Sequence, residues 1–253
     1  MIERTVDLKD IREDGVIRLP IGEDPGAPFA LLSLRPRGSM QYFHGVSNPR
    51  RDEFFRSQGI DPARVLAVEL VHSRTVLYPK DASELRNRQA DGIIVESDSL
   101  VPTVTVADCM PIWIRHASSG AYGVLHSGWR GTGILESAVR GLSKRYGASP
   151  SEIDVVLGPS IGPCCYRVPR ERAEVFIDRF GPEAAVFLDG AWRLDLPAAN
   201  IALARTLGLR SLTRVRGCTF CDEDLGSYRR EGPERFTRMV AAAFCGKRDR
   251  EAA

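Results

Sequence analysis

Three residues with metal-binding side chains each stand at the end of an apolar, strand-like segment. His72 follows the apolar run 65–71, Cys109 ends a run that begins at Val104, and His126 follows the run 121–125. A thiolate and two imidazoles are ligands that zinc prefers, and three protein ligands leave one coordination position open. We therefore expect these three residues to form a catalytic rather than a structural zinc site.

Each of these residues also has an ordinary structural explanation. A lone cysteine near a strand end is more often a small buried hydrophobe, and a lone histidine such as His72 is more often structural. Pro111 comes shortly after Asp108 and Cys109, so the chain turns there and the thiol can face a cleft. His126 begins HSGWRG, whose glycines permit a tight turn from a strand into a helix.

Three arginines are candidates for binding an anionic substrate. Arg130 lies just before the helix predicted at 133–146, and the start of a helix favours an anion. Arg229 and Arg230 follow Tyr228 and can present planar guanidinium groups to a phosphate. Solvated charges that bind nothing are the alternative for all three.

The other two histidines are not expected to bind a metal. His44 precedes Gly45 in a turn-like segment, and His116 begins a loop, 116–120, that we expect to be exposed. The zinc-deaminase signature, H-x-E with P-C-x-x-C, is also absent, because Ser-Gly follows His126 and the Pro-Cys-Cys of residues 163–165 lacks the spacer.

Four further cysteines occur as two pairs. Cys164 and Cys165 are adjacent, so their side chains should diverge, and a disulfide between neighbours is strained. We interpret their segment, 158–166, as a rigid structural turn. Cys218 and Cys221 form a C-x-x-C without a second pair at zinc-finger spacing, which is a weak signal for a zinc ribbon.

Hydrophobic periodicity predicts an α+β fold with a mixed β-sheet that helices cover. The segment 133–146 is the clearest helix, because its apolar residues recur at helical spacing and Gly147 stops it. Strands outnumber helices, and the strand pair within 103–125 is joined by a loop short enough for a hairpin. Strands are predicted at 29–34, 65–71, 92–95, 103–106, 112–114, 121–125, 155–157 and 211–215, and helices at 51–58, 133–146, 170–180, 197–207 and 235–244.

Composition limits the class of protein. The 253 residues suffice for one domain, 1–253, in which proline and glycine between 20 and 28 set off an N-terminal segment, 1–28. The net charge of +2 gives no sign of a nucleic-acid or membrane partner. We see no secretory signal or disulfide spacing, and we expect a cytoplasmic protein with reduced cysteines.

Seven short motifs occur in an order that resembles one known family. This is the laccase-domain family, also called the multicopper polyphenol oxidoreductase or peptidoglycan editing factor family. The resemblance extends from about residue 39 to residue 243. The motifs are Glu69-Leu-Val-His72, Ala90-Asp-Gly92, Ala107-Asp-Cys-Met-Pro111, His126-Ser-Gly-Trp-Arg-Gly131, the Gly-Pro-Ser-Ile-Gly-Pro-Cys-Cys-Tyr of 158–166, Cys218-Thr-Phe-Cys221 and Ser227-Tyr-Arg-Arg-Glu-Gly232.

The resemblance implies a fold, a metal and an activity. The family has a mixed α+β sandwich related to cysteine hydrolases that include toxin deamidases. Its zinc is held by one cysteine and two histidines, which correspond to His72, Cys109 and His126. Members phosphorolyse adenosine, inosine and methylthioadenosine, and some deaminate adenosine. The chain departs from the pattern around Asn48, which stands where relatives carry a longer segment with an asparagine that binds substrate, and at Glu231, where an aspartate is usual.

The function we expect is therefore a zinc-dependent purine nucleoside phosphorylase that uses small-molecule substrates. The main alternative is a cysteine hydrolase with Cys109 as nucleophile and His126 as base, acting on peptidoglycan precursors. A non-catalytic binding protein is a further alternative, against which the intact ligand set speaks. Copper laccase chemistry is not expected, because a multicopper site needs more histidines than the four in this chain. The oligomeric state is left open.

Overall fold

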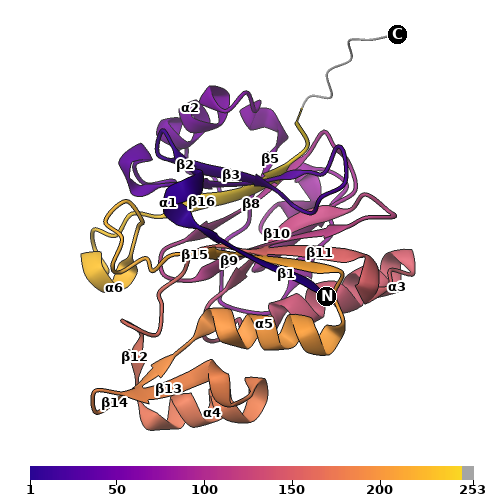
Figure 1. Ribbon diagram of the computed structural model, residues 1–253. Helices are drawn as coiled ribbons and strands as arrows, with labels where there is room; N and C mark the ends of the chain where they lie inside the picture. The colour runs from indigo at the N-terminus through magenta and orange to yellow at the C-terminus, as the bar shows by residue number, and fades with distance from the viewer. Residues whose placement is uncertain (247–253) are drawn as a thin grey trace.

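The fold consists of two stacked β-sheets with helices on their outer faces (Figure 1). The computed structural model describes residues 1–246. Each sheet contains both parallel and antiparallel strand pairs, so the protein has a mixed α+β architecture. No helix among the described residues is long and apolar enough to cross a membrane.

The larger sheet has seven strands in the order β1-β15-β11-β9-β10-β7-β6. β9 and β10 form an antiparallel hairpin, as expected, whereas β15 runs parallel to both β1 and β11. Its strands are β1 Ile2–Asp7, β6 Val76–Leu77, β7 Gly92–Val95, β9 Met110–His116, β10 Tyr122–Ser127, β11 Ile153–Leu157 and β15 Ser211–Arg216.

The smaller sheet has six strands in the order β2-β3-β4-β16-β8-β5. They are β2 Arg12–Glu13, β3 Val16–Pro20, β4 Phe29–Ser33, β5 Val65–Leu66, β8 Val101–Val106 and β16 Met239–Phe244. A three-stranded sheet stands apart from both, and it contains β12 Arg167–Val168, β13 Ala185–Leu188 and β14 Ala191–Leu194.

Helices close the two outer faces. The predicted helix at 133–146 is confirmed as α3, and Gly147 ends it in the left-handed conformation. Helices at the other predicted positions up to residue 207 are also present, with slightly shifted ends. The helices are α1 Leu8–Ile11, α2 Pro49–Ser57, α3 Ile134–Tyr146, α4 Arg170–Phe180, α5 Leu196–Leu207 and α6 Tyr228–Glu231.

Three layers of apolar side chains hold these elements together. One lies between the two sheets and includes Trp113 and Val104. A second packs the outer face of the seven-stranded sheet against α3 and α5 and extends to α4, which lies against α5, and a third packs α2 against the six-stranded sheet. Because both faces of each sheet are covered, the central strands read as continuous apolar runs rather than as alternating ones.

That burial explains the main error of the sequence prediction. The segment 235–244 is not a helix: its second half forms β16, which lies between β4 and β8 with every residue buried. A short apolar run cannot be assigned to helix or strand by periodicity alone. The strand predicted at 65–71 is shorter and ends at Leu66. The expectation that His116 is exposed is wrong as well, because it is buried at the end of β9.

Strands within 1–28 belong to both sheets. β1 extends the seven-stranded sheet beside β15, and β3 pairs with β4 in the other sheet. Neither strand was among those predicted from the sequence. The connection between β8 and β9 also links the sheets, because β8 belongs to the smaller one and β9 to the larger. This connection, residues 107–109, carries Cys109.

Candidate metal centre and cavity

Cys109 lies in the short connection between the two sheets. The residue before it, Asp108, has a φ of +80°, a left-handed conformation that few residues other than glycine adopt. Its carboxylate accepts hydrogen bonds from Thr219 Oγ1 at 2.6 Å and from the backbone N–H of Arg229 at 2.7 Å. These contacts hold the turn and leave the Cys109 side chain on the wall of a cavity.

His126 is buried near the end of β10 and is oriented by a carboxylate. Its Nδ1 lies 2.9 Å from Oδ1 of Asp91, which is itself fully buried. Asp91 precedes β7, the strand that pairs with β10. With Nδ1 bound to the carboxylate, the other ring nitrogen of His126 is available as a ligand, an arrangement that recurs around metal-binding histidines.

The same carboxylate fixes the loop that carries His72. Asp91 accepts hydrogen bonds from the backbone N–H of His72 at 2.9 Å and from the N–H and hydroxyl of Ser73 at 2.6 and 2.7 Å. His72 has a φ of +57°, so these bonds stabilise a backbone conformation that is otherwise unfavourable. Its ring lies edge-on to the ring of His126, with the centroids 4.9 Å apart.

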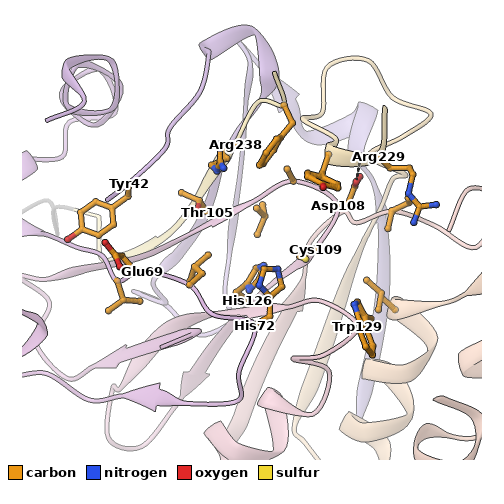
Figure 2. Close-up of a pocket in the computed structure, with 18 of the residues that line it drawn as sticks. Tyr42, Glu69, His72, Thr105, Asp108, Cys109, His126, Trp129, Arg229 and Arg238 are labelled. Atoms are coloured by element: carbon orange, nitrogen blue, oxygen red, sulfur yellow. Dashed lines mark hydrogen bonds between the residues drawn. The ribbon is translucent and has the colours of Figure 1, made fainter. Parts of the chain in front are cut away.

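The structure brings the three predicted ligands together. One nitrogen from each histidine and the sulfur of Cys109 lie within 4.8 Å of one another (Figure 2). Gly128 permits this approach, because a Cβ there would lie 2.6 Å from the Cys109 sulfur. The soft thiolate, the two imidazoles and the carboxylate behind His126 are a donor set that fits zinc.

The charges of the cluster favour ionisation of the Cys109 thiol. Burial by itself raises the pKa of Cys109, but the hydrogen bonds and charges of His126 and His72 outweigh it and lower that pKa to about 6. Burial lowers the pKa of His126, but the contacts with Cys109 and Asp91 outweigh it and raise that pKa to about 10. The thiol therefore ionises readily at neutral pH, as a metal ligand or a nucleophile must.

The cluster opens into a cavity of about 640 Å³. Figure 2 shows Cys109 and the two histidines on one wall, with Tyr42 and Glu69 on one side of them and Trp129 and Arg229 on the other. The remaining aromatic residues of the lining are Phe43, Tyr166, Tyr228 and Phe236. A space of this size with flat apolar walls and a few polar groups suits a small planar ligand.

Among the described residues, three arginines line the cavity, and only one of them, Arg229, was predicted from the sequence. Arg229 is present, with its guanidinium carbon 5.5 Å from the centre of the Tyr166 ring. Arg172 stacks 4.1 Å above Trp129, and Arg238 lies 3.9 Å from the Phe236 ring centre. Sequence reasoning missed the last two arginines, because neither belongs to a motif and Arg238 fell within a segment that was assigned to a helix.

The structure places three other predicted binding residues outside the cavity lining. Arg130 is exposed beside Trp129. Arg230 donates hydrogen bonds to backbone carbonyls, including that of Thr219 at 2.6 Å, so it holds a loop together. Asn48 caps the start of α2 and donates to the carbonyl of Gln41 at 2.9 Å.

The remaining histidines lie away from the cluster. Nδ1 of His44 lies 3.1 Å from the hydroxyl of Tyr42, and Nδ1 of His116 lies 2.8 Å from the hydroxyl of Ser119. Of the four histidines in the chain, only His72 and His126 contribute to the group of possible metal ligands.

The cysteine pairs behave differently from the expectation. Cys164, Cys165, Cys218 and Cys221 gather into a second cluster, with their sulfurs within 4.8 Å of one another. The side chains of the adjacent pair do not diverge here, because a turn that begins at Gly162 brings both sulfurs toward the C-x-x-C segment.

The sequence matches one family model, described as multi-copper polyphenol oxidoreductase laccase, over residues 45–245. The chain therefore belongs to this family. It is 32% identical over 184 residues to the purine nucleoside phosphorylase Cgl2154/cg2365 of Corynebacterium glutamicum, covering 69% of this chain and 72% of the relative. It is 33% identical to the purine nucleoside phosphorylase YlmD of Geobacillus stearothermophilus over 63% of this chain and 60% of that protein.

A solved structure has the same fold. The hypothetical protein YfiH of Bacillus licheniformis superposes with a TM-score of 0.78, covering 87% of this chain and 93% of its own, at 22% sequence identity. At that identity the likeness concerns the fold alone.

Proposed function

We propose that this protein is a zinc-dependent purine nucleoside phosphorylase that converts adenosine, inosine or methylthioadenosine and phosphate to the free base and the corresponding ribose 1-phosphate. The observation that carries the proposal is the His72, Cys109 and His126 cluster, which opens into a cavity lined by aromatic rings and arginines. The relatives named purine nucleoside phosphorylase support the same reaction class.

Phosphate would bind at the side of the cavity that carries Arg229 and Arg172. Burial and the charge of Cys109 raise the pKa of Tyr166, the charges of Arg172 and Arg229 oppose this rise, and the resulting pKa is about 12. Both guanidinium groups therefore act on one place beside Cys109, and guanidinium groups bind phosphate oxygens through paired charge-assisted hydrogen bonds. Glu69, on the other side of the cavity, would repel phosphate and favours this orientation.

The purine would lie against the aromatic walls. Stacking on rings such as Trp129 and Tyr228 holds a flat base without requiring one particular purine. In the reaction, a phosphate oxygen forms a bond to C1′ of the ribose while the bond from C1′ to the purine nitrogen breaks. The base leaves with the electron pair and takes up a proton. The arginines orient the phosphate, and the apolar walls limit the access of water.

Zinc bound by the cluster would supply a Lewis acid at the cavity wall. The chain itself contributes the orientation of the ligands: Asp91 holds His126 and the loop of His72 in place. We include adenosine deamination as a second reaction of this cavity, and its readout is inosine formed without phosphate. We also propose a cytoplasmic location, because no disulfide forms among the described residues, as is usual for proteins of a reducing compartment.

One observation favours a second candidate, a cysteine hydrolase. Cys109, His126 and Asp91 form a nucleophile, base and carboxylate in series, with the thiol pKa lowered and the imidazole pKa raised. This arrangement suits covalent catalysis by a thiolate, and peptidoglycan precursors would be the substrates. This candidate would also agree with the fold relationship to cysteine hydrolases that the family resemblance implies. Zinc would occupy the thiolate, so the two candidates exclude each other in one molecule.

The deciding experiment incubates adenosine and inosine with the purified protein, with and without phosphate, and separates the products by chromatography. The phosphorylase predicts free base and ribose 1-phosphate only when phosphate is present. Inosine from adenosine without phosphate indicates deamination. If both nucleosides stay unchanged while peptidoglycan precursors are cleaved and iodoacetamide blocks the cleavage, the hydrolase replaces the phosphorylase.

A further inference from the structure

The second cysteine cluster lies outside the proposed catalytic residues. Cys164 and Cys165 lie on the loop after β11, and Cys218 and Cys221 follow β15, more than fifty positions later in the sequence. The two loops are already aligned by backbone contacts: the N–H of Thr219 donates to the carbonyl of Ser160 at 3.1 Å. The convergence of the four thiols is therefore built into the fold.

The spacing of the sulfurs is that of a metal site. Four bonds of about 2.3 Å in a tetrahedron place sulfurs about 3.8 Å apart. The sulfur of Cys221 lies 3.7 Å from that of Cys164 and 3.3 Å from that of Cys165. All four sulfurs lie within 4.8 Å of one another, so each can reach a single central ion.

The backbone around Cys218 also suits a thiolate ligand. The backbone N–H of Gly162 donates to the sulfur of Cys218 at 3.3 Å, a contact that stabilises negative charge on sulfur. Space beside Gly162 is limited, since a Cβ there would lie 3.3 Å from the sulfur of Cys164 and 3.6 Å from that of Cys218. The C-x-x-C segment forms a turn in which the N–H of Cys221 donates to the carbonyl of Cys218 at 3.1 Å.

We propose that Cys164, Cys165, Cys218 and Cys221 bind a second zinc ion in a closed, structural tetrathiolate site. Four protein ligands leave no open position, so this ion would tie the loops together rather than take part in the reaction. Soft thiolates select zinc over the hard cations magnesium and calcium.

The proposed ion would stabilise one wall of the substrate cavity. The loop after β11 contributes Ile161 and Tyr166 to the lining, and the segment after β15 leads to Tyr228 and Arg229. Thr219, inside the C-x-x-C segment, also donates to Asp108 beside Cys109. A structural zinc would thus fix the relative position of the segments that enclose the reacting groups. This role does not depend on which reaction the cavity catalyses.

Zinc content per chain tests the proposal. The full chain is purified under reducing conditions, loaded with excess zinc, freed of loosely held metal on a desalting column, and measured by atomic emission. We expect two zinc ions per chain for the wild type, one for Cys109→Ala, and one for the double substitution Cys218→Ser with Cys221→Ser. Cys245→Ser, which removes a thiol outside both clusters, should keep both.

Cobalt in the Cys109→Ala protein gives a second readout that does not depend on the folding of the double variant. Because Cys109→Ala removes the thiolate of the first site, strong sulfur-to-cobalt charge-transfer bands and tetrahedral ligand-field bands in this protein must arise from the second cluster. We expect those bands, and we expect zinc to displace them. Their absence, or a zinc content in the Cys218→Ser, Cys221→Ser variant equal to that of the wild type, would overturn the proposal. So would a mass spectrum of the unreduced protein showing a disulfide among these four cysteines after zinc loading.

Discussion

Replacing Asp91 by asparagine should weaken zinc binding strongly, although Asp91 is not itself a ligand. One carboxylate oxygen of Asp91 faces Nδ1 of His126 and the N–H of His72, and the other faces the N–H and hydroxyl of Ser73. Both oxygens therefore accept from donors. An amide has only one oxygen, so in either orientation its NH₂ group would point at an N–H group.

The size of the effect follows from these contacts. Loss of a carboxylate behind a ligating histidine typically costs 10–100-fold in metal affinity or activity, which corresponds to about 1.4–2.8 kcal/mol of binding free energy. A buried donor left without a partner also costs about 1–3 kcal/mol of folding free energy. We therefore expect Asp91→Asn to lower both the zinc affinity and, in the zinc-free protein, the free energy of unfolding.

The assay is a competition titration against a chromophoric zinc chelator at neutral pH, with circular dichroism as the check of folding. The matched control is Ser73→Ala, which removes one hydrogen bond to Asp91 and leaves the contact with His126 intact. Its effect on zinc affinity should be clearly smaller. A folded Asp91→Asn protein with wild-type zinc affinity would refute the role assigned to this carboxylate.

Three further substitutions test other parts of the account. Gly128→Ala places a Cβ 2.6 Å from the Cys109 sulfur, so zinc affinity should fall at least about tenfold by the same chelator titration; unchanged affinity would contradict the close approach of the two segments. Arg229→Ala removes a charge-assisted contact of about 1.5–3 kcal/mol, so the KM for phosphate should rise about 10–100-fold while the KM for nucleoside changes little; an equal rise in both would argue against a phosphate role. Burial raises the pKa of Glu231, but the N–H groups of Ser227 and Thr237 outweigh it and lower that pKa overall. A lowered carboxyl pKa stabilises the folded state above the unfolded pKa of about 4.3, and the stabilisation is lost as the pH falls through the folded pKa. Glu231→Gln should therefore cost most at neutral pH, and urea titrations should show the difference from wild type shrinking on acidification; a constant difference would refute the linkage.

The metal ligands could be predicted from the sequence because each carries a local signal. His72, Cys109 and His126 all stand where an apolar run ends. The strands in those runs belong to both sheets, β5 and β8 to the six-stranded one and β10 to the seven-stranded one, so the stacking of the two sheets brings the three side chains together. Asp91 belongs to the Ala90-Asp-Gly92 motif, but that motif does not indicate which residue the carboxylate contacts, and only the pairing of β7 with β10 sets it beside His126.

Features that depend on distant contacts could not be predicted. The four-cysteine cluster joins segments that are far apart in the chain, and nothing in the spacing of either pair points to the other. Arg172 is one of several charged residues on α4 and reaches the cavity only through the packing of that helix. The strand β16 was assigned to a helix because its complete burial removes the alternation that identifies a strand.

The most direct test of the central claim measures ribose 1-phosphate formed from inosine and phosphate by the zinc-loaded wild type, by Cys109→Ala and by Cys245→Ser. We predict phosphate-dependent product from the wild type and from Cys245→Ser, and almost none from a folded Cys109→Ala protein that has lost one zinc. Wild-type rates in Cys109→Ala, or no ribose 1-phosphate from the zinc-loaded wild type, would contradict the claim that this cluster is the centre of a nucleoside phosphorylase.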